Sequence, residues 1–113
     1  MDQRRSRDRK HLTQTIDVMD VINQCKLGEL VNLSMGGMMI MCENELEINS
    51  IFQLSMRLPA EINGITDLQV GVDCLWCRHV DNFHRYWAGF QIIDASDETL
   101  ACIQNLLETY AID

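Results

Sequence analysis

Residues 68–78 read LQVGVDCLWCR and residues 85–93 read RYWAGFQII. In both stretches apolar side chains recur at every second position, which is the period of a β-strand with one buried side. One face of the first stretch is predicted to carry Leu68, Val70, Val72, Cys74 and Trp76, with Cys77 on the other. One face of the second is predicted to carry Tyr86, Ala88, Phe90 and Ile92, with Trp87, Gly89 and Gln91 pointing away. These stretches therefore predict two strands that each bury one side.

Four further apolar stretches precede these two and are separated by turn-forming residues. We expect strands at 13–22, 28–33, 37–43 and 50–58, with a break over residues 59–66 that begins at the single proline of the chain. Six short strands that each bury one face must close on themselves or pack as two layers. The sequence therefore predicts a mainly β domain.

The last segment of the chain changes to a helical period. Serine at position 96 is a favourable N-cap, and the acidic residues that follow it suit the positive end of a helix dipole. Apolar side chains then recur at spacings of three and four, at Leu100, Ile103, Leu107 and Tyr110. We expect an amphipathic helix over about residues 96–110, whose apolar face packs on the core of the domain rather than on a partner.

The composition is that of one folded domain, with 113 residues of which 47% are hydrophobic and 23% charged. The formal net charge of −8 is unevenly distributed. Residues 1–10 hold five basic and two acidic residues, a net of +3, whereas residues 11–113 hold four basic and 15 acidic residues, a net of −11. Binding to a long nucleic acid needs a broad basic face, so the acidic body argues against such polymers. A short basic arm suits a small ligand with few phosphates.

The sequence also bears on the cellular compartment. No apolar run approaches the roughly 20 residues that span a bilayer, and no apolar region of a secretory signal follows the basic N-terminus. The cysteines number five, and an odd number favours free thiols in a reducing compartment over a disulfide framework. We therefore expect a cytoplasmic protein without a membrane span.

No arrangement typical of catalysis or of a metal site is evident. The three histidines have no setting that marks a nucleophile and base pair. Cys74 and Cys77 lie three apart on a predicted strand, so we expect their side chains to face opposite sides, and zinc would need two more ligands. We therefore expect no enzyme, no metal site and no cofactor.

Two short motifs remain as candidate ligand contacts. Arg5 and Arg9 form an Arg-x-x-x-Arg pair within residues 1–11, an arm that we expect to be flexible until a ligand orders it. Arginine meets phosphate with a planar fork of donors and also stacks on flat rings. Residues 32–37, which read NLSMGG, join two predicted strands. Taken singly, the first motif is an ordinary solvated charge run and the second an ordinary β-turn.

Together, in this order, the two motifs resemble those of the PilZ domain family. Arg5 and Arg9 match the first element of the family motif. Asn32, Ser34 and Gly37 match the second, which begins 23 residues after the first element ends. The resemblance implies a six-stranded antiparallel β-barrel with a C-terminal helix over residues 12–113, and it implies that the arm clamps the second messenger cyclic di-GMP.

The resemblance also implies a role for each residue of the motifs. Arg5 and Arg9 are expected to hold the phosphates and the guanine faces of cyclic di-GMP. Asn32 and Ser34 are expected to hydrogen-bond guanine edges, and Gly37 is expected to leave room for the ligand. An asparagine amide can both donate to and accept from a guanine edge, although it lacks the charge of an aspartate.

Three further residues are candidates for additional ligand contacts. Arg4 and Arg7 lie in the same arm as the matched arginines. Trp87 is predicted to point away from the core, where an exposed indole can stack on guanine. The alternative for Trp87 is that the helix or a dimer contact covers it.

We therefore expect a cyclic di-GMP receptor that catalyses no reaction. In this hypothesis the arm closes over the ligand and changes the docking of a partner that controls motility, pili or exopolysaccharide. The alternative is a ligand-independent PilZ-like scaffold that acts through protein contacts alone. A small barrel for single-stranded nucleic acid is disfavoured by the acidic body and by the presence of only seven aromatic residues. The sequence leaves open the partner, the number of ligands and the formation of a homodimer.

Overall fold

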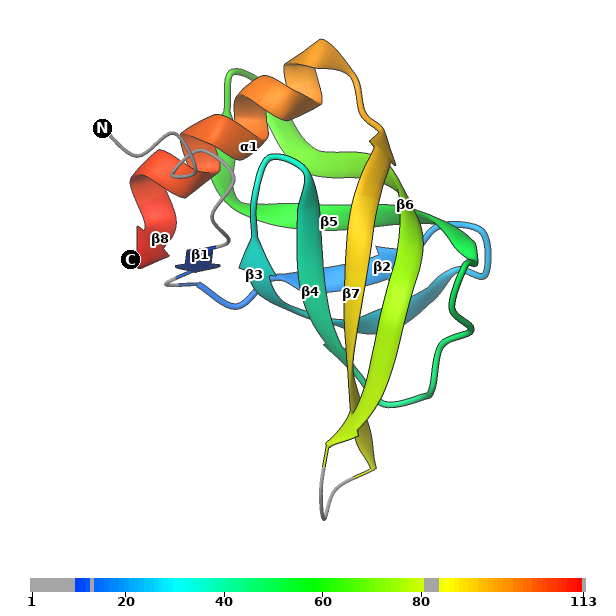
Figure 1. Cartoon of the computed structure of the whole chain (residues 1–113). Helices are drawn as coiled ribbons and strands as arrows, with labels where there is room; N and C mark the ends of the chain where they lie inside the picture. The colour runs from blue at the N-terminus through cyan, green and yellow to red at the C-terminus, as the bar shows by residue number, and fades with distance from the viewer. Residues whose placement is uncertain (1–9, 13, 81–83, 113) are drawn as a thin grey trace, which may run out of the picture.

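The computed structural model describes residues 10–12, 14–80 and 84–112, and the predicted contacts Arg4, Arg5, Arg7 and Arg9 lie outside this part. Within these ranges eight strands and one helix follow one another (Figure 1). Their bounds are β1 Lys10–Leu12, β2 Asp17–Asp20, β3 Cys25–Leu33, β4 Gly37–Cys42, β5 Ile51–Ile62, β6 Ile65–Val80, β7 Arg85–Asp94, α1 Asp97–Tyr110 and β8 Ala111–Ile112.

Six of the strands close into a ring. The order is β2-β5-β6-β7-β4-β3, and β3 pairs in turn with β2, so that the sheet returns to its start. Every pairing in the ring is antiparallel. The short strands β1 and β8 extend the sheet outward from β3. The prediction of a mainly β, six-stranded antiparallel barrel with a C-terminal helix is therefore confirmed.

The barrel encloses one apolar core. Ala88 and Phe90 on β7 are fully buried, and the Phe90 ring meets that of Phe52 edge to face with the ring centres 5.9 Å apart. Trp87 and Gln91, which alternate with them, are exposed. The alternation predicted for residues 85–93 is therefore confirmed, because β7 pairs with β4 from Tyr86 to Gln91 without a bulge.

A β-bulge in β6 overturns part of the face assignment. Cys74 pairs with Phe90 and Trp76 pairs with Gly89, so two steps along β6 match one step along β7. An extra residue of this kind reverses the inside–outside alternation beyond it. Trp76 therefore lies on the outer face, whereas Cys77, opposite buried Ala88, packs against the core. Cys74 and Cys77 do not face opposite sides as predicted.

The break predicted over residues 59–66 is a tight hairpin instead. β5 continues through Pro59 to Ile62, and Ile62 pairs directly with Ile65 on β6. The two residues between them, Asn63 and Gly64, have φ angles of 51° and 83°. Asparagine and glycine are the residues that a two-residue hairpin with positive φ angles requires. The proline is accommodated where the β5–β6 register is irregular, between residues 57 and 62.

The first predicted strand, 13–22, is shorter in the structure. β2 ends at Asp20, whose Oδ1 accepts hydrogen bonds from the backbone N–H groups of Ile22 at 3.1 Å and Asn23 at 3.2 Å. A side chain that binds the backbone two and three residues later forms a turn in place of a strand. Asp20 therefore ends the strand despite the apolar residues that follow it.

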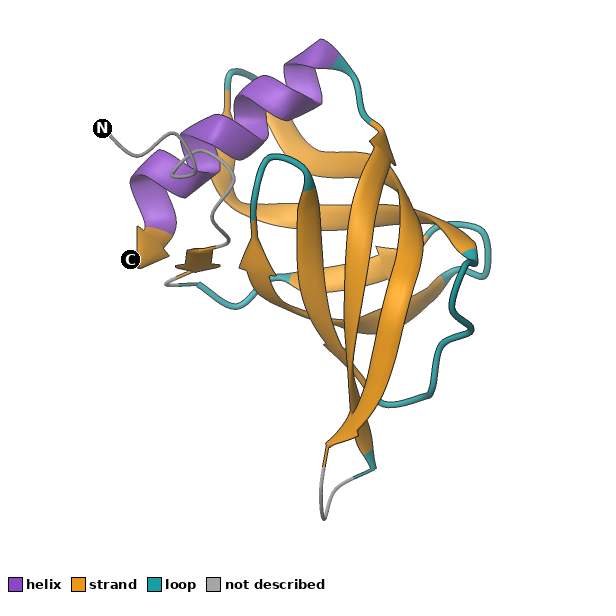
Figure 2. Ribbon diagram, viewed as in Figure 1, coloured by secondary structure: helices purple, strands orange, loops and turns teal. Residues whose placement is uncertain are grey.

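The helix α1 begins as predicted and lies across one end of the barrel (Figure 2). The Thr99 backbone N–H donates to Ser96 Oγ at 3.1 Å, which is the expected N-cap bond. Its buried face is rotated relative to the predicted one: the buried side chains are Thr99, Cys102, Ile103 and Leu106. Leu100 and Leu107 are half-buried at the margin. No helix in the described ranges is long and apolar enough to cross a bilayer.

Candidate functional site

The turn between β3 and β4 is closed by the hydroxyl group of Ser34. The Ser34 backbone N–H donates to the Gly37 carbonyl at 2.9 Å. Ser34 Oγ accepts from the N–H groups of Gly36 at 3.3 Å and Gly37 at 3.1 Å, and it lies 3.3 Å from the Gly37 carbonyl oxygen, to which it can donate. Both the donor and the acceptors of this buried hydroxyl are therefore engaged within the turn.

Replacing Ser34 by alanine is expected to loosen this turn and to lower the free energy of unfolding by about 1–3 kcal/mol, because two N–H groups lose their acceptor. Urea unfolding followed by circular dichroism measures the change. Ser55→Ala is the matched control, since Ser55 is half-buried on β5 and makes no side-chain hydrogen bond within the described part. Equal midpoints for the two variants would contradict the assigned role.

Asn32 lies two residues before Ser34, next to the last residue of strand β3, and is only 9% exposed. Its Oδ1 is buried and has no hydrogen-bond partner within the described residues. Leaving a buried acceptor unpaired costs about 1–3 kcal/mol, so such an atom calls for an explanation. Bound water and a ligand with hydrogen-bond donors are the two physical candidates.

A row of register partners crosses the outer face of the barrel from Asn32. Asn32 pairs with Met39 on β4, Met39 with Gly89 on β7, and Gly89 with Trp76 on β6. The indole of Trp76 lies against Gly89, where a Cβ atom would come closer than 3.0 Å to the ring. Trp76 therefore shares a surface with Asn32, a placement that sequence reasoning missed because no local pattern marked the bulge.

Trp87 lies farther from the turn than Trp76. Gly37 pairs with Gln91, and Trp87 is four residues from Gln91 along β7, about 13 Å at the usual rise of a strand. Its side chain is 41% exposed, so the helix does not cover it. Of the two tryptophans, Trp76 is the better placed to meet a ligand held at Asn32.

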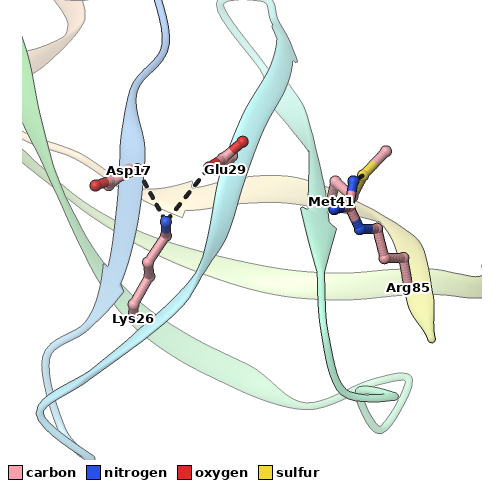
Figure 3. Close-up of polar contacts among 5 residues, drawn as sticks. All are labelled: Asp17, Lys26, Glu29, Met41 and Arg85. Carbon is pink, nitrogen blue, oxygen red and sulfur yellow. Dashed lines mark hydrogen bonds and ion pairs between the residues drawn. The ribbon is translucent and has the colours of Figure 1, made fainter. Parts of the chain in front are cut away.

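The described basic residues differ in their availability to a phosphate. Lys26 is held by Asp17 at 3.2 Å and by Glu29 at 3.3 Å (Figure 3), and Arg57 by Asp67 at 2.7 Å. The Arg85 side chain lies 3.7 Å from the Met41 sulfur in the same view.

Arg78 lies beside Trp76, at the end of the row opposite to Asn32. Its guanidinium lies 5.5 Å from the centre of the Trp76 ring, a cation–π distance. Arg78 therefore brings a positive charge to the surface that Trp76 shares with Asn32.

A hollow of about 440 Å³ lies beside the turn. Its lining consists of Ser34, Met35, Gly36, Gly37, Leu75, Phe90 and Gln91. The hollow therefore joins two of the three predicted turn residues to side chains of β6 and β7. Within the described ranges no three side chains of the metal-binding types gather in one place.

The start of the described chain lies beside the same turn. Lys10 pairs with Leu33 and His11 with Asn32, so β1 runs antiparallel to the end of β3 (Figure 1). Residues 1–9, which hold the predicted arginine clamp, precede β1 directly. The described chain therefore begins next to the residues of the second motif.

Comparison with known proteins identifies the family. The family model of the PilZ domain matches residues 3–109. The chain belongs to the PilZ domain family. PilZ domains are in general receptor and adaptor modules rather than enzymes. No match is found among curated protein sequences.

A solved PilZ protein has the same fold as this PilZ domain. The Bacillus subtilis inhibitor of motility, MotI/DgrA, superposes with a TM-score of 0.70 at 12% sequence identity. The alignment covers 96% of this chain and 51% of that one, so the PilZ domain described here spans about half the length of that protein. The likeness supports the barrel and helix described above.

Proposed function

We propose that this PilZ domain is a receptor for cyclic di-GMP that acts on a partner protein and catalyses no reaction. The observation that carries the proposal is the unpaired Oδ1 of Asn32, an acceptor nine-tenths buried beside the turn. Guanine presents N–H donors on its edge, and an asparagine amide can accept from one group while it donates to another. A guanine of the proposed ligand would therefore supply the hydrogen-bond donor that Asn32 Oδ1 lacks.

The pairing of β1 with β3 supports a clamp by Arg5 and Arg9. Arg9 is the neighbour of Lys10 in sequence, and Arg5 precedes Lys10 by five residues. An extended chain spans at most about 3.6 Å per residue, so the Cα of Arg5 is within about 18 Å of the Cα of Lys10. Since Lys10 pairs with Leu33, both arginines are within reach of the hollow. Arg4 and Arg7 are within the same reach and remain candidates for additional contacts.

The remaining motif residues take different parts in this proposal. Ser34 shapes the turn, because its hydroxyl is already engaged there. Gly37 is buried at the start of β4 and lines the hollow as backbone. Trp76 presents an aromatic face near Asn32 for stacking, and Trp87 offers a second, more distant one.

The charges of the chain fit a ligand with two phosphates. The arm carries a net charge of +3 and the rest of the chain −11, so a long polyanion is repelled by the body while a small one can be held by the arm. When the arm is laid over the ligand, the surface offered to a partner changes. The similarity to an inhibitor of motility makes a motility component the first partner to test, with pili and exopolysaccharide synthesis as the others.

Calorimetric titration of the full chain with cyclic di-GMP tests the proposal. We expect micromolar or tighter binding that an Arg5→Ala, Arg9→Ala double variant weakens roughly 100-fold or more, because two charge-assisted contacts are lost. Arg57→Ala is the matched control, since Arg57 is paired with Asp67 elsewhere on the barrel. Absence of heat and of any thermal shift with the wild-type chain would favour the ligand-independent scaffold.

A further inference from the structure

Asp73 lies on the outer face of the barrel, two strands away from the turn. It pairs with Ile51 on β5 and with Gln91 on β7, and Gln91 pairs in turn with Gly37. Neighbouring strands are about 4.8 Å apart, so Asp73 is about 10 Å from Gly37 across the sheet. Gln91 lines the hollow beside the turn and forms the bridge between the two positions.

The carboxylate of Asp73 contains the second unpaired buried oxygen of the described chain. Asp73 Oδ1 and Asn32 Oδ1 are the two buried side-chain atoms there without a hydrogen-bond partner. A carboxylate oxygen accepts hydrogen bonds and cannot donate, so only an N–H or O–H group or a cation can satisfy it. Its register partners, an isoleucine and a glutamine, bring no positive charge, and none of the described ion pairs includes it.

We propose that Asp73 selects guanine over adenine by accepting hydrogen bonds from the N1–H and N2–H groups of one guanine of the bound dinucleotide. This inference rests on the proposed function and adds its specificity. Guanine presents two adjacent donors that match the two oxygens of a carboxylate, whereas adenine presents an unprotonated N1 beside its amino group. A carboxylate facing adenine would therefore meet one acceptor instead of a donor.

Asn32 and Asp73 take complementary parts in this recognition. Asn32 is on β3 and Asp73 on β6, on opposite sides of the Gly37–Gln91 pair, so the two acceptors meet different purines. An amide can rotate to suit either base because it carries both a donor and an acceptor, but a carboxylate cannot. Discrimination between cyclic di-GMP and cyclic di-AMP, its adenine counterpart, therefore depends on Asp73 more than on Asn32.

If Asp73 serves ligand binding and not folding, replacing it should not lower the stability of the domain. Asp73 is half-buried, and nothing described bonds to its buried Oδ1, which is costly to the fold. Asp73→Asn removes the charge at nearly constant shape. We expect an unfolding midpoint equal to or above that of the wild-type chain.

Titrations of the chain of residues 1–113 with cyclic di-GMP and with cyclic di-AMP test the inference. The Asp73→Asn variant is expected to bind cyclic di-GMP about 10- to 100-fold more weakly, the range of one bidentate base contact. Its affinity for cyclic di-AMP should be unchanged or higher, because an amide matches the adenine edge. Asp67→Asn is the matched control, since Asp67 is on the same strand and is paired with Arg57.

The outcomes separate this inference from the proposed function. If the wild-type chain binds no cyclic di-GMP, the proposed function and this inference both fail. If the wild-type chain binds but Asp73→Asn keeps its full preference for guanine, the inference is wrong while the receptor function stands. Equal losses for both dinucleotides, together with a lowered unfolding midpoint, would assign Asp73 a structural role and would also overturn it.

Discussion

Replacing Gly28 by alanine is expected to destabilise the barrel by about 3 kcal/mol or more, the upper end of the range for overpacking. Gly28 is buried on β3, opposite Cys42 of β4. A Cβ at this position would come closer than 3.0 Å to the carbonyl oxygen and carbon of Met41 and to a methyl group of Ile40. A backbone carbonyl cannot swing aside as a side chain can, so β4 itself would have to move.

Thermal and urea unfolding measure this loss. A domain of this size is usually stable by only about 5–15 kcal/mol, so a loss of this size lowers the melting temperature by more than about 10 °C. Gly36→Ala is the control, because a Cβ at Gly36 would meet no atom within 4 Å. The control is expected to stay within about 0.5 kcal/mol of the wild-type chain. Similar midpoints for the two variants would show that the strands adapt without cost.

Replacing Gly89 by alanine is expected to expel the indole of Trp76 from its place on the outer face. The new Cβ would lie within 3.0 Å of three atoms of the ring, and the ring is the mobile end of a side chain. We expect a loss of about 1–3 kcal/mol in the free energy of unfolding and a change in tryptophan fluorescence. If Trp76 stacks on the ligand as proposed, affinity for cyclic di-GMP falls as well.

A double-mutant cycle isolates this effect. In a Trp76→Ala background the clash is absent, so Gly89→Ala should cost much less than it does in the wild-type chain. The coupling energy between the two positions is therefore expected to be large, with the double variant more stable than the sum of the two single losses predicts. Additive losses in the cycle would mean that Gly89 is required for a reason other than its contact with Trp76.

The predictable part of the fold is the part in which local pattern and long-range pairing agree. The face of β7 and the N-cap at Ser96 were both predicted correctly, since each depends on neighbours in the sequence. The bulge in β6 depends on how that strand pairs with β7, and no sequence pattern near Trp76 predicts it. The Asn63-Gly64 hairpin did have a local signal in its Asn-Gly pair, but Pro59 nearby favours a longer break in the strand.

The candidate site was predictable to the same extent. The motif residues Asn32, Ser34 and Gly37 do lie together at one turn, because they are neighbours in sequence. Trp76 and Asp73 reach the same face only through the pairing of β6 with β7 and of β7 with β4. The inward-facing hydroxyl of Ser34 is a property of the folded turn, and the sequence motif does not distinguish it from a hydroxyl aimed at a ligand.

The pairing of β1 with β3 also tethers the proposed binding arm beside its target. A short covalent tether holds a binding group at an effective concentration in the millimolar range near its target. Lys10 pairs with Leu33, so if residues 1–9 bind at the hollow as proposed, a separate peptide of the same sequence would need to reach millimolar levels to match them. Inserting glycine and serine residues between Arg9 and Lys10 would dilute the arm without altering any contact. In the proposed receptor, affinity for cyclic di-GMP therefore depends on the connectivity of the chain as well as on the groups that touch the ligand.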